Sequence, residues 1–111
     1  MGRNQNRTRD VAVRAVAFEE DGVWVVQGIE YDICTHAKEA AEVPQAFYRA
    51  VIENICITQH LGRRPLEGIK PAPKRFREMF ERAESRLMPV HELGSPELPR
   101  ADMDIRLAEH A

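Results

Sequence analysis

Three β-prone segments follow one another in the first third of the chain, and this run limits the fold more than any other feature. Residues 11–18 are small, β-branched and aromatic, and residues 23–27 hold the strongest strand pattern of the sequence. The Asp-Gly pair at 21–22 is typical of a two-residue hairpin turn. Gly28 indicates a bulge or a close backbone approach, and residues 29–35 then alternate apolar and polar side chains. The pattern predicts a three-stranded antiparallel meander with one face free for a helix.

Residues 43–61 predict the helix that covers this face. Pro44 suits the first helical turn, where a backbone N–H is not needed, and Gly62 suits the position just after the helix. Apolar residues recur at helical spacing over about half of the helical wheel: Val43, Ala46, Phe47, Ala50, Val51, Ile55, Ile57 and Leu61. Ile52 and Cys56 fall on the polar side of the wheel, so we expect another surface to cover them.

The remaining chain divides into shorter pieces around the predicted core at 11–61. Residues 1–10 predict a basic, flexible N-terminus, and residues 62–73 predict a turn-rich linker. Residues 74–88 predict a second amphipathic helix. Residues 89–111 predict an extended connector and a C-terminal strand at 102–108, with a disordered acidic tail as the alternative. The predicted class is α+β, a small antiparallel β-sheet in the chain order β-β-β-α-α-β with one face covered by a helix.

Composition narrows the function classes. A chain of 111 residues with 43% hydrophobic and 31% charged residues has the profile of one globular domain. Its apolar runs are too short to cross a bilayer, and the first ten residues lack the apolar segment of a secretory signal, so we expect a cytoplasmic protein with no membrane contact. A formal net charge of −2 excludes a whole-protein basic field. Cys34 and Cys56 cannot supply a disulfide framework, so we expect free thiols.

About forty residues, from the VRAVAF run at 13–18 through to Val51, resemble the HicB-like antitoxin family. The resemblance rests on the first strand, the acidic Asp-Gly turn, the aromatic second strand around Trp24, the Glu-Tyr-Asp-Ile segment at 30–33 and the opening of the helix. The chain departs from the family where residues 28–34 replace the usual Pro-Asp-Leu-Pro-Gly-Cys segment. It also has no recognisable DNA-binding module after the core.

The resemblance implies a non-catalytic protein-interaction module. HicB-like antitoxins occlude a small HicA-type ribonuclease, so the expected partners are a small toxin protein or further copies of the chain. Because no DNA-binding module follows the core, the sequence resembles an orphan type of the family. No cofactor is expected, and no dinucleotide-binding, P-loop or common hydrolase motif occurs in the sequence.

Glu30 and Asp32 are the candidate residues for an enzymatic alternative, a metal-dependent nuclease. Two residues apart on a strand, their carboxylates project from one face and could hold a divalent ion or act as acid and base. The simpler interpretation is that Ile29, Tyr31 and Ile33 alternate with them toward the core, which leaves the carboxylates in solvent or facing a basic partner.

Cys34, His36, Cys56 and His60 together make a Cys2His2 set, which raises the question of zinc. Cys34 and His36 share a face of the predicted third strand, whereas Cys56 and His60 share the side of the helix turned away from the sheet. Their spacing matches no standard zinc finger. We therefore expect no metal site within one chain, with a site between chains as the alternative, and interpret Cys56 as a small buried hydrophobe.

A basic segment is the best nucleic-acid candidate. It carries six positive charges and one acid, Glu67, within residues 63–77: Arg63, Arg64, Lys70, Lys74, Arg75 and Arg77. Glutamates interleave just beyond it, which favours a solvated linker and helix face. Nucleic-acid binding through this segment therefore remains an alternative function.

Self-association is expected on physical grounds as well. A thin sheet covered on one face by a helix leaves its other face and its edges open, so we predict a homodimer or larger oligomer. The candidate interface residues are apolar side chains without an assigned place in the core: Trp24, Val26, Ile52, Cys56, Phe76, Met79 and Phe80.

Overall fold

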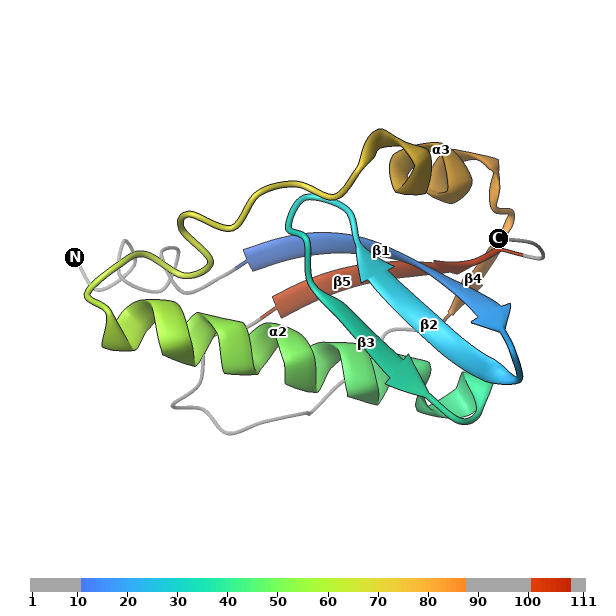
Figure 1. The fold of residues 1–111 in the computed structure, drawn as a ribbon, viewed down its shortest axis with the longest axis horizontal. Helices are drawn as coiled ribbons and strands as arrows, with labels where there is room; N and C mark the ends of the chain where they lie inside the picture. Colours follow the sequence, from blue (N-terminus) through green and yellow to red (C-terminus); the bar gives the residue numbers. More distant parts are fainter. Residues whose placement is uncertain (1–10, 88–100, 109–111) are drawn as a thin grey trace.

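The computed structural model describes residues 11–87 and 101–108, and the ends of the chain and residues 88–100 lie outside this range (Figure 1). The predicted flexible N-terminus and most of the predicted connector therefore fall outside the described residues. The elements in chain order are β1 Val11–Glu20, β2 Val23–Gly28, β3 Cys34–Ala37, a 3-10 turn η1 at Ala40–Glu42, α2 Val43–His60, α3 Lys74–Arg82, β4 Ser85–Leu87 and β5 Ala101–Leu107.

The strands form one five-stranded sheet in the order β3-β2-β1-β5-β4. The α+β class is confirmed, and the predicted C-terminal strand is present as β5. The sheet is mixed rather than antiparallel, because β5 pairs parallel to β1 over the whole register from Val11↔Ala101 to Ala17↔Leu107. Strand β4, which pairs antiparallel to β5, was not predicted.

The first hairpin has the predicted turn. Asp21 and Gly22 both have positive φ, 54° and 79°, which is the backbone of the tight turn whose twist suits two antiparallel strands. Strand pairing continues directly from it, with Glu20 opposite Val23. An aspartate and a glycine are among the few residues that adopt this conformation at low cost.

The third strand starts later than predicted, at Cys34 instead of Ile29. The N–H of Gly28 donates to the C=O of Ile33 at 2.8 Å and closes the hairpin there, so residues 29–32 form a loop. The backbone of this loop is held by Arg14 C=O, which accepts from the Ile29 N–H, and by Lys70 C=O, which accepts from the Asp32 N–H. Gly28 makes the predicted close approach, because a Cβ there would lie 2.7 Å from the Tyr31 carbonyl oxygen.

Helix α2 runs along one face of the sheet (Figure 1). Phe47, Val51 and Ile55 are fully buried against the inward residues of β1 and β5, such as Val13 and Ile105. The C-terminal end of the helix lies beyond the near ends of the strands (Figure 1).

Two predictions about α2 are wrong, the first because of this extension and the second because Ile52 lies only about 60° from the buried Ile55 on the helical wheel. Ile57 and Leu61, assigned to the buried stripe, are 58% and 60% exposed. Ile52, assigned to the polar side, is 9% exposed and belongs to the core beneath α2.

The opposite face of the sheet is also covered, by α3, so the prediction of a single covered face is wrong (Figure 1). Phe76, Met79 and Phe80 pack against Val16 and Phe18 of β1. The Phe18 and Phe76 rings stack with centroids 6.1 Å apart. The helix is shorter than predicted because Ala83 is already extended, and the chain enters β4 two residues later.

The predicted linker at 62–73 is tied to the core. Leu66 is fully buried although its φ is +64°. Its N–H donates to the hydroxyl of Thr58 at 3.0 Å, and that hydroxyl donates in turn to the carbonyl of Ile55 at 2.9 Å. A buried hydroxyl thus satisfies an amide that no helix or strand pairs.

Candidate functional site

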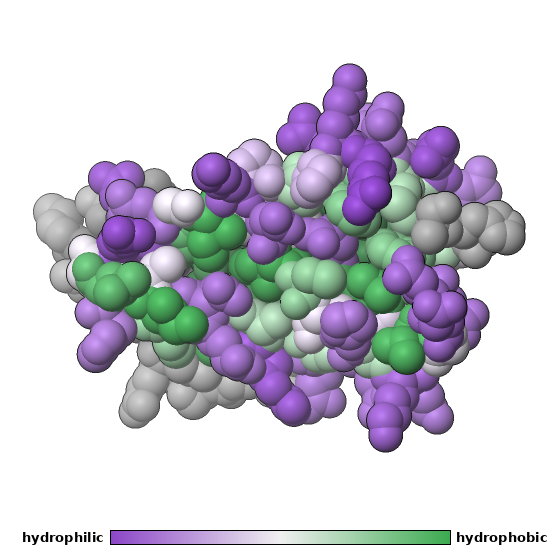
Figure 2. Space-filling model, viewed as in Figure 1, coloured by the Kyte–Doolittle hydropathy of each residue, from purple (hydrophilic) through white to green (hydrophobic). Residues whose placement is uncertain are grey.

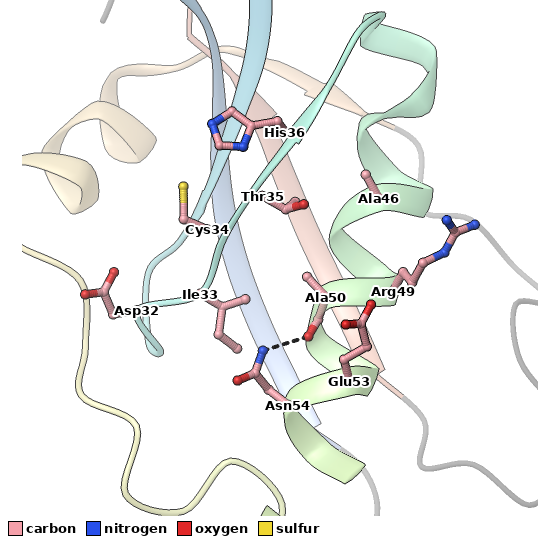
Figure 3. Close-up of a pocket in the computed structure, with 10 residues that line it drawn as sticks. All are labelled: Asp32, Ile33, Cys34, Thr35, His36, Ala46, Arg49, Ala50, Glu53 and Asn54. Carbon is pink, nitrogen blue, oxygen red and sulfur yellow. Dashed lines mark hydrogen bonds between the residues drawn. The ribbon is translucent and has the colours of Figure 1, made fainter. Parts of the chain in front are cut away.

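An open groove lies between the outer strand β3 and the flank of α2 (Figure 3). Its volume is about 520 Å³. The strand contributes one wall and the helix the other, through Asp32, Ile33, Cys34, Thr35, His36, Ala46, Arg49, Ala50, Glu53 and Asn54. The close-up shows Thr35 pointing toward α2, while Cys34 and His36 point away from the helix.

Strand β3 is an edge of the sheet, and its outward backbone groups can be identified. Hydrogen-bonded and non-hydrogen-bonded pairs alternate along an antiparallel ladder. Because Gly28 bonds Ile33, the next hydrogen-bonded pair is Val26↔Thr35, and Gln27↔Cys34 lies between the two. Cys34 and His36 therefore direct their N–H and C=O groups away from β2, on the side where β3 has no neighbouring strand among the described residues.

The helix flank beside this edge carries a stripe of small and apolar residues. At 100° per residue, Ala46, Ala50, Ile57 and Leu61 lie within about 60° of one another on the wheel. Ala46 and Ala50 line the groove, and the exposed Ile57 and Leu61 continue the stripe beyond it. Figure 2 shows hydrophobic side chains at the surface over the C-terminal end of α2, at the left of the view.

Sequence reasoning missed this exposed pair. The hydrophobic period alone placed Ile57 and Leu61 in the core, because it contains no information on where the sheet ends. The lengths of the elements do not supply the missing signal, because β1 is about 33 Å long and α2 about 27 Å. The pair is exposed because of the position of α2, whose C-terminal end lies beyond the ends of the strands (Figure 1).

Asp32 lies two residues before the start of β3 and interacts with Gln27 and Cys34. The side-chain amide of Gln27 donates to Asp32 Oδ1 at 2.8 Å. Partial desolvation of the thiol, and then the negative charge of Asp32, raise the pKa of Cys34. Cys34 is a free thiol, as is Cys56.

Glu30 and Asp32 do not form the predicted strand-borne pair, because they belong to a loop. Glu30 makes an ion pair with the Arg14 guanidinium, and its Oε1 also accepts the Arg14 backbone N–H at 2.7 Å. Asp32 is engaged by Gln27. Each carboxylate thus has a structural partner of its own.

The Cys2His2 set is divided between two elements. Cys34 and His36 are exposed on β3, and Cys56 and His60 are exposed on α2. Among the described residues, no group of three or more His, Cys, Asp or Glu side chains is placed to hold a metal ion. The interpretation of Cys56 as a buried hydrophobe is wrong, because α2 turns this position outward.

All six cations of the basic segment are exposed. None forms an ion pair within the described part of the chain. They are distributed from the loop after α2 to the outer side of α3, where the Arg75 guanidinium lies 4.6 Å from the centroid of the Phe76 ring. The arrangement is a strip of positive charge rather than a single patch.

Most of the predicted interface residues serve the core of their own chain. Val26 is fully buried, Trp24 is half-buried, and Ile52, Phe76, Met79 and Phe80 are buried. The expected exposure of Val26 is wrong because this residue faces the core beneath α2, as Ile52 does, while the apolar residues of α3 pack on the other face of the sheet. Cys56 is the one member of the set that is fully on the surface.

Neither helix in the described range has the length and apolarity that a bilayer crossing requires. Comparison of the chain with family models, with curated proteins and with solved structures gives no match.

Proposed function

We propose that this chain is a HicB-like, non-catalytic protein-interaction module that acts by binding another protein chain, either a small ribonuclease-type partner or a second copy. The observation that carries the proposal is the exposed Ile57–Leu61 pair on α2, at the end of an apolar stripe beside an open sheet edge. Two large aliphatic side chains one helical turn apart form a surface that gains free energy when a partner covers it.

The sheet edge supports the same function. An edge strand with outward N–H and C=O groups pairs readily with an extended segment of another chain. Helix and strand thus offer one continuous surface with an apolar part and a hydrogen-bonding part. In the HicB-like family, which the first half of the sequence resembles, such binding occludes a small ribonuclease.

The test is a measurement of molar mass by light scattering, with and without nuclease pretreatment, followed by titration into a HicA-type ribonuclease. We expect a nuclease-insensitive complex in at least one of the two experiments, and loss of RNA cleavage if the ribonuclease is the partner. A chain that stays monomeric and neither binds nor inhibits the ribonuclease would contradict the proposal.

Nucleic-acid binding is the second candidate, and the exposed, unpaired cations of the basic segment favour it. It predicts an affinity for RNA or DNA that falls steeply as salt rises. The double substitution Lys74→Glu, Arg75→Glu should reduce the slope of log affinity against log salt by about two, one for each phosphate that the variant no longer neutralises. An unchanged slope would exclude α3 from the nucleic-acid interface.

A further inference from the structure

We propose that two copies of this chain pair through the free edge of β3 and the adjoining flank of α2, about a two-fold axis that passes by Thr35. The inference rests on the proposed function and specifies one partner, a second copy. The two sheets would join edge to edge into a continuous ten-stranded sheet, with the two α2 helices side by side on the same face.

The strand register follows from the backbone. In an antiparallel pair, residues whose polar groups point outward must lie opposite one another, and here these are Cys34 and His36. Pairing Cys34 with His36 of the partner subunit gives the outward N–H and C=O groups of both residues a hydrogen-bonding partner. The two-fold symmetry repeats these hydrogen bonds on the other side of the axis. A shift toward Asp32 is disfavoured, because its N–H already donates to the Lys70 carbonyl at 2.6 Å.

Side chains at the axis suit self-pairing. Thr35 meets Thr35 of the partner subunit in a non-hydrogen-bonded pair, an arrangement in which two threonines interact favourably. Thr35 points toward α2 in Figure 3, so this contact lies between the joined strands and the helix layer.

The helix flank is complementary to itself when two copies run antiparallel. Its N-terminal part is small, with Ala46 and Ala50, and its C-terminal part is bulky, with Ile57 and Leu61. Ala46 and Ala50 lie level with Thr35, so an axis by Thr35 sets the small residues of the two helices against each other, where they allow close packing. Ile57, about 10 Å further along the helix than Ala50, then lies beside the start of the partner's helix. Arg49 and Glu53 carry opposite charges and lie one turn apart on the groove wall. The same axis can place Arg49 of each copy beside Glu53 of the other.

The helix contact is tested with two glutamate variants at exposed positions two residues apart. Ile57→Glu places a charge in the proposed interface, whereas Gln59→Glu places the same charge about 160° round the helix, outside it. For the wild type and for Gln59→Glu we expect twice the chain mass of 12.7 kDa over a dilution series, and for Ile57→Glu half of that value. Circular dichroism confirms that each variant is folded.

The strand register is tested by disulfide cross-linking. Thr35→Cys, in a chain with Cys34→Ala and Cys56→Ala, places two thiols across the axis at a Cα separation of about 4.5 Å, within the range of a disulfide. The control keeps only Cys34, whose partner copy lies diagonally at about 7–8 Å, beyond the usual limit. We expect an oxidised dimer for the first chain and none for the control.

Each other outcome overturns the inference. A dimer that resists Ile57→Glu, or cross-linking by Cys34 but not by Thr35→Cys, means that two copies meet through another surface, and the proposed function stands. A monomeric wild type refutes the pairing, and the ribonuclease titration then decides the proposed function separately.

Discussion

The two faces of the sheet are covered by helices that differ in length and in their place along the chain. Helix α2 has 18 residues and follows the meander directly, whereas α3 has nine and reaches the other face only after the 62–73 segment. The core under α2 includes residues of β1, β2, β5 and the linker, while the core under α3 is a small group around Phe18 and Phe76. The main core of the molecule lies between α2 and one face of the sheet, and a smaller, largely aromatic core lies between α3 and the other face.

The largest effect is expected on the α2 face. Phe47→Ala empties a fully buried site at the centre of this core and should lower the free energy of unfolding by about 4–5 kcal/mol. Urea denaturation measures the loss, with Gln59→Ala on the exposed side of the same helix as a control within about 0.5 kcal/mol. If Phe47→Ala lowers the free energy of unfolding by less than Phe80→Ala on the α3 face does, the ranking of the two cores is reversed.

On the α3 face, Phe80→Ala should cost about 3 kcal/mol, the lower end for a buried aromatic residue. The Phe80 ring also lies beneath two guanidinium groups, with Arg106 at 4.2 Å and Arg14 at 5.3 Å from its centroid, so the substitution removes two cation–π interactions as well. Arg77→Ala, exposed on α3, is the matched control in the same denaturation experiment. If both variants unfold at the same urea concentration, α3 does not pack on the sheet in solution.

The link between α2 and the 62–73 segment is tested by Thr58→Val. The variant leaves the buried Leu66 N–H without an acceptor and should cost about 1–3 kcal/mol. Thr58→Ser keeps the hydroxyl and should lose only the contribution of one methyl group, about 0.8 kcal/mol. Equal losses for the two variants would show that packing, rather than the hydrogen bond, holds the segment.

The smallest effect concerns the cysteine on the α3 side of β3. The raised pKa of Cys34 leaves less thiolate at pH 8, so alkylation of Cys34 should be slow and should accelerate as the pH rises further. Asp32→Asn removes one of the two causes, lowers this pKa and should speed the reaction by less than about ten-fold. The rate is measured in a Cys56→Ala chain, with Glu19→Gln as the control. No acceleration by Asp32→Asn would assign the shift to burial alone.

Local patterns were sufficient for much of the fold. The Asp21-Gly22 turn, the first two strands, α2 and the C-terminal strand follow from short-range rules on turn chemistry and hydrophobic period. The parallel pairing of β1 with β5 does not, because 90 residues separate Val11 from Ala101 and no local signal states which strands meet. For the same reason, the amphipathic pattern of α3 predicts a helix but not the face that it covers.

The candidate site was harder to predict than the fold. Glu30 and Asp32 were assigned to a strand because their neighbours alternate in polarity. The hydrogen bond from the Gly28 N–H to the Ile33 carbonyl, however, closes the β2–β3 hairpin and leaves both residues in the loop between the strands. The edge position of β3 depends on the strand order of the whole sheet. Ile57 and Leu61 are exposed because α2 outruns the sheet, a relation between two elements that neither pattern contains by itself.

The interior position of β5 has a consequence for biosynthesis. Strand β1 has two neighbours, and one of them, β5, is synthesised only after α2, α3 and β4. Until residues 101–107 emerge, the nascent chain carries the β1–β2 hairpin with one long edge of β1 open and with Ile105 missing from its core. The sheet should therefore be completed only after residue 107 has been synthesised, and the open edge of β1 would be a binding site for chaperones until then.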